Sequence, residues 1–90
     1  MPDKRPLPVF PGLREAAERR RREVIEELAT ARRDQGLSQT VVAARMDTSQ
    51  SVVARLESGA IDVRLSTLER YAAAVGRDLE WRVRPTGDAR

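Results

Sequence analysis

Apolar residues recur at helical spacing in the first half of the chain. Residues 13–35 contain no Pro or Gly and are rich in Ala, Glu, Arg and Leu, which favour helix. Only the second half of this segment carries an apolar stripe along one side, formed by Val24, Ile25, Leu28 and Ala31. We therefore predict a helix that packs through its C-terminal half, projects beyond the core at its N-terminal half, and ends at Gly36.

The projecting half of this helix carries four consecutive arginines at positions 19–22. They point around the whole circumference, and Glu15, Glu18 and Glu23 are interleaved with them. Opposite charges four positions apart support a solvated helix. We interpret the run as a solvated face, with a phosphate-binding patch as the alternative.

Small polar residues mark the starts of the next two helices. Ser38 is expected to cap a helix over residues 39–46, and Thr48 or Ser49 a second helix that runs to about Glu57. The inward positions of both helices are apolar: Val42, Ala43, Met46, Val53 and Leu56. Two helices joined by a short turn have the layout of a helix-turn-helix, here over residues 39–58.

A further short helix is expected to begin with a capping box, in which Ser66 accepts from a free backbone N–H and Glu69 reaches back. Gly76 ends this helix, and its inward side carries Leu68, Tyr71, Ala72 and Val75 at helical spacing. Residues 13–77 are therefore predicted to form one helical domain.

Residues 78–84 change to strict alternation, which predicts a strand over residues 78–85 that ends at Pro85, before a tail over residues 86–90. A lone strand leaves backbone N–H and C=O groups without partners. The same strand of a second copy could pair with it, which would place Leu79, Trp81 and Val83 in a homodimer interface. Alternatively, the strand folds back onto its own helices, with Trp81 in the core.

Residues 1–12 contain four prolines, which predicts an extended arm. The arm is either a disordered leader or a strap that packs on a partner through Phe10. It lacks an apolar signal core, and no run in the chain approaches the roughly 20 apolar residues of a membrane span. We therefore expect a cytoplasmic protein with no membrane partner.

Composition argues against catalysis. The 90 residues include 17 Lys and Arg against 14 Asp and Glu, for a net charge of +3, and they allow one small domain. The chain has no Cys and no His, so it lacks thiolate ligands, disulfides and the commonest general base. No Gly-rich phosphate loop or nucleophile–base set is present. We expect no enzyme activity, no cofactor and no metal.

The outward positions of the second helix of the motif suit contact with double-stranded DNA. Gln can pair with adenine, Arg with guanine, and a short Ala can approach a thymine methyl group. The candidate base contacts are Gln50, Ser51, Ala54 and Arg55. Free N–H groups at helix starts attract phosphate. The candidate phosphate contacts are Ser38, Gln39, Thr48, Ser49, Ser58 and Arg64.

Four motifs resemble the Xre (Cro/repressor) helix-turn-helix family over roughly residues 24–76: GLSQ at 36–39, TSQS at 48–51, LESG at 56–59 and TLERYAAAVG at 67–76. The resemblance implies a mainly α, lambda-repressor-like bundle of four to five helices. It also implies that Gln39 and Gln50 lie side by side at the DNA and that Arg32 and Glu57 form a structural ion pair. Asp47 stands where the family often has a left-handed Gly, and Asp tolerates that conformation better than most residues.

The ending, TLERYAAAVGRDLEWRVRP, resembles HigA-type antitoxins. This resemblance implies a dimeric repressor that binds an inverted-repeat operator, autoregulates its operon and neutralises a small basic RelE/HigB-like toxin. Two alternatives stay open: a stand-alone Xre-type repressor without a toxin, and a helical protein-interaction adaptor that has lost DNA binding.

Overall fold

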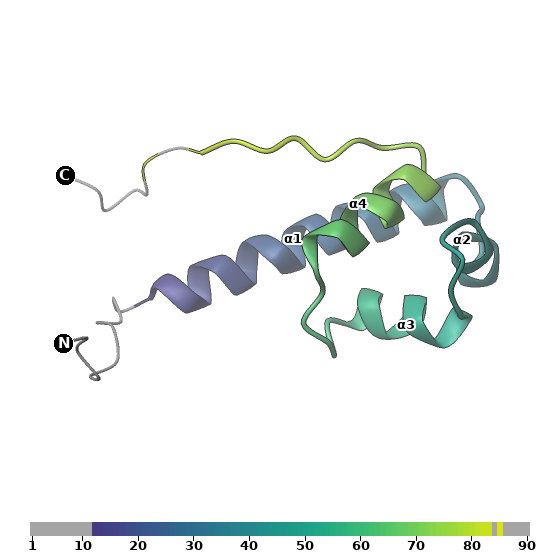
Figure 1. The fold of residues 1–90 in the computed structure, drawn as a ribbon, viewed down its shortest axis with the longest axis horizontal. Helices are drawn as coiled ribbons and strands as arrows, with labels where there is room; N and C mark the ends of the chain where they lie inside the picture. Colours follow the sequence, from purple (N-terminus) through teal and green to yellow (C-terminus); the bar gives the residue numbers. More distant parts are fainter. Residues whose placement is uncertain (1–11, 84, 86–90) are drawn as a thin grey trace, which may run out of the picture.

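Four α-helices make up the part of the chain that the computed structural model describes, residues 12–83 and 85. They are α1 (Leu13–Asp34), α2 (Gln39–Arg45), α3 (Gln50–Ser58) and α4 (Leu65–Ala74), shown in Figure 1. The protein is therefore mainly α, as predicted. Phe10 and the predicted tail lie outside the described residues, as does all of the predicted arm except Gly12.

Helix α1 is buried only along its C-terminal half. Its buried residues are Ile25, Leu28, Ala29 and Ala31, whereas residues 12–23 are exposed or half-buried. Figure 1 shows the N-terminal half extending past the other helices. The distribution of apolar residues along the segment therefore predicted correctly which half of the helix packs. Within the described residues, no helix is both long and apolar enough to cross a membrane.

The core collects apolar side chains from all four helices. Its largest fully buried members are Tyr71, Leu56, Val42, Val53 and Val75. Residues outside the helices, including Leu37, Ile61, Val63 and Leu79, pack partly buried against this core. The core thus holds the C-terminal half of α1, the α2–α3 pair and α4 as one packed unit.

Local signals explain how α2 and α3 begin and how they are joined. Ser38 Oγ accepts from the backbone N–H of Val41 at 3.1 Å, and Ser49 Oγ accepts from that of Val52 at 3.3 Å. Ser49, rather than Thr48, is therefore the cap of α3. The turn between the helices passes through Asp47, whose φ of 56° is the only positive non-Gly value among the described residues. The left-handed conformation expected at Asp47 is confirmed.

The predicted start of α4 is wrong. The helix begins at Leu65, with Arg64 in the cap position and no side-chain cap, so Ser66 lies inside the first turn. The carbonyl of Arg64 accepts from the N–H groups of Thr67 and Leu68 at 3.0 and 3.1 Å. The Glu69 carboxylate does not reach back to the helix start but accepts from Trp81 Nε1 at 3.1 Å. With Arg64 in the cap position, Ser66 and Glu69 lie two positions too far along the helix to form the expected capping box.

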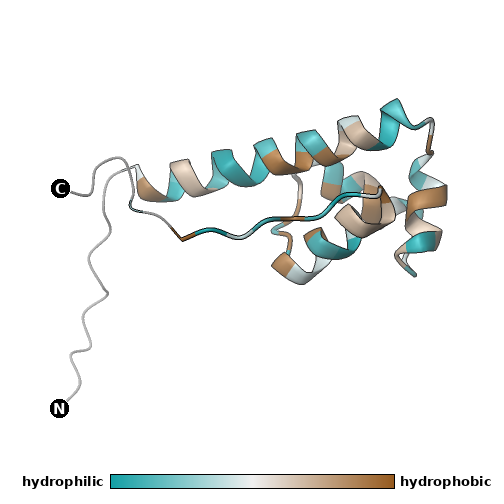
Figure 2. Cartoon of the chain, turned by 90° about the horizontal axis from the view of Figure 1, so that it is seen from above, coloured by the Kyte–Doolittle hydropathy of each residue, from teal (hydrophilic) through white to brown (hydrophobic). Residues whose placement is uncertain are grey.

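Residues 77–83 are extended and run back along α1 (Figure 2). Their backbone from Asp78 to Val83 makes no hydrogen bond to the described residues, so the segment does not form a strand there. Leu79 is half-buried against the core, whereas Trp81 is 54% exposed and Val83 is fully exposed. Trp81 is therefore not a core residue, and the paired strand of a dimer remains a prediction.

Candidate nucleic-acid interface

Helix α3 presents one side to the core and the other to solvent. Val53 and Leu56 are fully buried against the bundle, which fixes the rotation of the helix. Gln50, Ser51 and Arg55 are consequently exposed, and Ala54 is half-buried. Figure 1 shows α3 at the edge of the bundle, on the side away from the extended segment 77–83. The structure thus places the four predicted base-contacting residues along an accessible helix.

A chain of hydrogen bonds connects the start of α3 to the interior. Gln50 Nε2 donates to Gln39 Oε1 at 2.6 Å, and Gln39 Nε2 donates to Glu57 Oε1 at 3.0 Å. The two glutamines expected side by side are therefore in direct contact, across the turn between α2 and α3. Because the side-chain amide of Gln39 donates a hydrogen bond to Glu57, its carbonyl oxygen is oriented toward Gln50. The exposed Gln50 side chain is held in a defined orientation.

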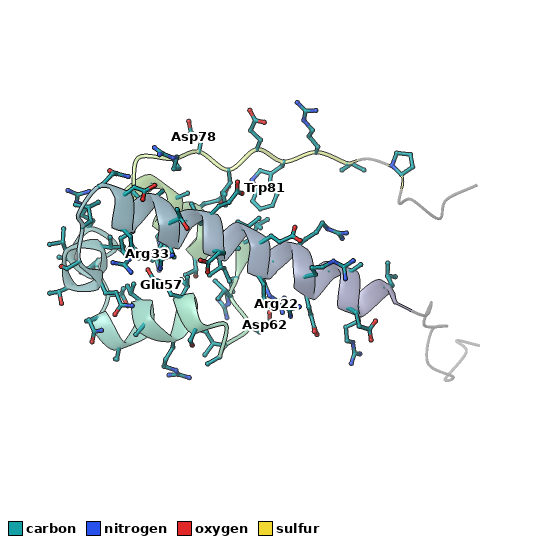
Figure 3. The ribbon with its side chains drawn as sticks, turned by 180° about the vertical axis from the view of Figure 1, so that it is seen from behind. Arg22, Arg33, Glu57, Asp62, Asp78 and Trp81 are labelled. Carbon is teal, nitrogen blue, oxygen red and sulfur yellow. The ribbon has the colours of Figure 1, made fainter. Side chains whose placement is uncertain are left out.

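Glu57 is the centre of this chain of hydrogen bonds and joins α3 to the three other helices. Arg32 from α1 makes a bidentate contact with it, Nε to Oε2 at 2.6 Å and Nη2 to Oε1 at 3.0 Å. The Tyr71 hydroxyl from α4 donates to Glu57 Oε2. The remaining guanidinium nitrogen of Arg32, Nη1, donates to the carbonyl of Leu37 at 2.9 Å. Figure 3 shows Glu57 pointing from α3 toward α1.

The charges of this cluster stabilise one another in a nearly dry site. The side chains of Arg32 and Glu57 are only 11% and 9% exposed. Burial opposes ionisation of Glu57, but hydrogen bonds from Arg32, Tyr71 and Gln39 outweigh it and lower the pKa of the carboxyl. The hydrogen bond to Glu57 is the main reason that the pKa of Arg32 is raised. Burial and then the hydrogen bond to Glu57 raise the pKa of Tyr71, which stays a neutral donor.

Comparison with known proteins agrees with this geometry. The profile of the helix-turn-helix family matches residues 28–82 of the chain. The chain belongs to the helix-turn-helix family. It is an Xre-type member and carries a DNA-binding domain.

Two curated relatives are proteins named Antitoxin HigA1, from the CDC 1551 / Oshkosh and ATCC 25618 / H37Rv strains of Mycobacterium tuberculosis. Each is 43% identical over 68 residues, which cover 76% of this chain and 45% of the relative. The chain thus spans less than half the length of the curated relatives it matches. No solved structure gives a significant match.

The six residues expected at phosphates of the helix-turn-helix do not form one cluster. Ser38 and Ser49 use their hydroxyls as caps, and Gln39 lies in the Glu57 network. Thr48 is half-buried in the turn, whereas Ser58 donates to the carbonyl of Arg55 at 2.9 Å. Arg64 is exposed and shares no hydrogen bond with the other five in the described part of the chain. The six residues therefore lie near the starts of α2, α3 and α4 and at the end of α3.

Sequence reasoning missed three polar residues that hold the helix-turn-helix in place. Tyr71 was expected only as an apolar inward residue, although a buried hydroxyl signals a polar partner. Arg45 Nη1 donates to the carbonyl of Ala74 at 2.8 Å, and Gln35 Nε2 to that of Val75 at 2.8 Å. These two bonds satisfy carbonyls at the end of α4. Nothing in their local sequence identified those distant partners.

A metal or cofactor site was not expected from the sequence. Within the described residues, no group of three or more His, Cys, Asp or Glu side chains is arranged to hold a metal ion. The polar side chains of α3 can donate and accept hydrogen bonds.

Proposed function

We propose that this chain is a sequence-specific transcriptional repressor that inserts α3 into the major groove of double-stranded DNA. The orientation of Gln50 is the observation that carries the proposal, because its hydrogen bond to Gln39 continues to the buried Glu57. A side chain already held in place loses less conformational entropy on binding. Gln50 pairs with an adenine, Arg55 with a guanine, and Ser51 and Ala54 approach neighbouring base edges.

The residues at the two ends of α3 position it on the backbone of the duplex. Ser38, Gln39, Thr48 and Ser49 contact phosphates at the helix start, and Ser58 and Arg64 contact phosphates beyond its end. Backbone N–H groups in the first turn of α3 support an anion there. Such contacts set register and orientation rather than sequence preference.

Dimerisation holds the α3 helices of the two copies at a fixed separation and orientation. The extended segment of each copy pairs with the other, which satisfies its free backbone groups and covers Trp81 and Val83, with Leu79 at the edge of the interface. Both the unpaired backbone and the exposure of Trp81 support this assignment. Two recognition helices about 34 Å apart then fit an inverted-repeat operator.

The antitoxin role is proposed from the similarity to the two HigA1 antitoxins. The chain neutralises a small basic toxin of the RelE/HigB-like type and represses the operon that encodes both proteins. Co-expression with the product of the adjacent reading frame tests this role. A stable complex that relieves toxicity supports it, whereas a non-toxic, non-binding product leaves a stand-alone repressor.

DNA recognition is tested by fluorescence anisotropy with the DNA directly upstream of the gene. Replacing Arg55 with Ala removes a base contact, so we expect a loss of about 1–3 kcal/mol, or roughly 5- to 150-fold in affinity. Arg14→Ala is the matched control, because Arg14 is exposed on the projecting half of α1 and lies outside the arginine run at positions 19–22. Affinity falls steeply with salt if phosphates are contacted. Unchanged affinity of the Q50A/R55A double variant would reject the base-contact assignment, and absent DNA binding by a folded protein would favour the adaptor.

A further inference from the structure

A groove of about 840 Å³ lies between the C-terminal half of α1 and the start of the extended segment. Its apolar lining includes Val24, Leu28, Ala31 and Leu79, of which Val24 and Leu79 are only half-buried. The α1 side of the groove runs from Glu23 to Asp34, which corresponds to about 16 Å of helix. This length accommodates about eleven residues of a helix or five residues of an extended chain.

The polar lining of the groove is strongly acidic. Six acidic residues contribute to it, against one arginine, Arg77: Glu23, Glu26, Glu27, Asp34, Asp78 and Glu80. Glu26 pairs with Arg33 at 3.1 Å, and the other five form no salt bridge to the described residues. Because the whole chain carries a net charge of +3, this acidity is a local property of the groove. Half-buried apolar side chains lie between carboxylates of which five have no ion pair within residues 12–83, and this lining suits an occupant that is both basic and apolar.

We propose that this groove docks a basic amphipathic segment of a partner protein. Arg or Lys side chains of that segment pair with the acidic rim, and its apolar side chains cover Val24 and Leu79. The inference deepens the antitoxin part of the proposed function and rests on it, since the toxin is the basic partner expected there. Figures 1 and 3 show the extended segment and α3 on opposite sides of the bundle, so an occupied groove leaves α3 free for DNA.

The groove is tested with a synthetic 12-residue peptide that carries Arg along one side of a helix and Leu along the other. The control peptide has Glu in place of Arg. Amide chemical shifts of the ¹⁵N-labelled protein map the contact, and calorimetry measures affinity. We expect the Arg peptide to shift the amides of residues 23–34 and 77–80, and the Glu peptide to leave them unchanged. Shifts confined to α3, or no shifts at all, would overturn the proposal.

Matched variants separate the groove from general charge attraction. The triple variant E23Q/E27Q/E80Q removes three rim charges and should weaken peptide binding at least tenfold. The control triple E15Q/E18Q/D62N changes the net charge equally but alters acids that do not line the groove, and it should change affinity less than twofold. An equal loss in both triples would refute a specific site. Leu79→Ala should also weaken binding, with circular dichroism checking the fold.

Two further measurements keep this proposal distinct from the repressor. Both triples should change the affinity for the upstream DNA to the same extent, because each removes three negative charges and no substituted residue lies on α3. If the unsubstituted protein binds the peptide but not the upstream DNA, the repressor function is refuted and the proposal of a docking groove stands. If the protein binds the DNA but not the peptide, the docking groove is refuted and the repressor function stands. A switch from dimer to monomer in E23Q/E27Q/E80Q would show that a second copy occupies the groove and would overturn the proposal.

Discussion

The helical bundle buries most of its large apolar side chains, whereas the extended segment 77–83 leaves most of its own in solvent. Leu56 and Val53 are fully buried, but Trp81 is 54% exposed and Val83 entirely so. An α-helix satisfies its backbone internally, so packing of one apolar side is enough to place it. An extended segment must find backbone partners elsewhere. The contrast explains why the bundle packs within one chain, and it is the basis for the proposal that the segment pairs with a second copy.

The polar contacts of the bundle are buried, whereas those of the extended segment are exposed. Glu57 is held by residues of three helices in a site that is almost closed to water. The bond between Trp81 and Glu69 joins two exposed side chains. Hydrogen bonds in low dielectric are stronger and costlier to break. Substitutions in the two regions should therefore affect different properties of the protein.

The largest effect is expected from Leu56→Ala, which opens a cavity in the middle of the bundle. Such truncations cost about 2–5 kcal/mol of the free energy of unfolding. Leu65→Ala is the matched control, because Leu65 is exposed, and it should cost about 0.5 kcal/mol or less. Urea denaturation followed by circular dichroism measures both. Equal losses would mean that α3 is not anchored by its buried side.

A somewhat smaller loss, about 3 kcal/mol, is expected for Glu57→Gln. The substitution leaves the Arg32 guanidinium nearly buried without its counter-charge. Glu26→Gln, which breaks the exposed pair with Arg33, should cost about 0.5 kcal/mol or less. Because Gln50 is held through this network, DNA affinity of the folded E57Q protein should also fall. Full stability and full affinity in E57Q would contradict the proposed role of the network.

Trp81→Ala should separate the two regions most clearly. We expect it to weaken dimerisation by about 2 kcal/mol, as for a central interface residue, and to change the free energy of unfolding of the monomer by about 0.5 kcal/mol. Sedimentation equilibrium measures the first quantity and urea denaturation at low concentration the second. A dimer of unchanged affinity would show that the protein associates through a helix surface instead.

The smallest effects on the free energy of unfolding are expected from changes in pH. One titrating group contributes at most about 1.4 kcal/mol per pH unit. Since the pKa of Glu57 is lower in the folded protein, the unfolded chain binds more protons as the pH falls below about 4.5, and stability is lost there. The raised pKa of Tyr71 means that the unfolded chain loses its proton first above about pH 10, which also reduces stability. Unfolding experiments across pH check both limbs. E57Q should flatten the acid limb, and Y71F the alkaline one.

Signals within a few residues were enough to predict most of the bundle. Apolar spacing located the helices, and Ser38 identified the start of α2. The same kind of signal failed at α4. Ser66 and Glu69 match a capping box, yet Glu69 accepts from Trp81, twelve positions away. The motif was misplaced because the helix begins at Leu65, with Arg64 rather than Ser66 in the cap position.

The sequence predicted some contacts of the candidate site but not the network that joins them. The resemblance to a family paired Arg32 with Glu57 and Gln39 with Gln50, and the structure brings both pairs together. That all four belong to one network with Tyr71 could not be read from spacing, because five residues from four helices meet there. The orientation of Gln50 is therefore a product of packing.

The amino-acid sequence by itself determined which segments are helical, that α2 begins after Ser38, and which side of each helix is apolar. Those features depend on interactions between residues within about one turn of each other. Only the tertiary structure decided that Glu57 gathers partners from three other helices, that Trp81 stays outside the core, and that acids of α1 and of residues 78–80 border one groove. Those features depend on which surfaces come into contact when the helices pack. These contacts join residues far apart in the sequence, so a local sequence pattern does not predict them.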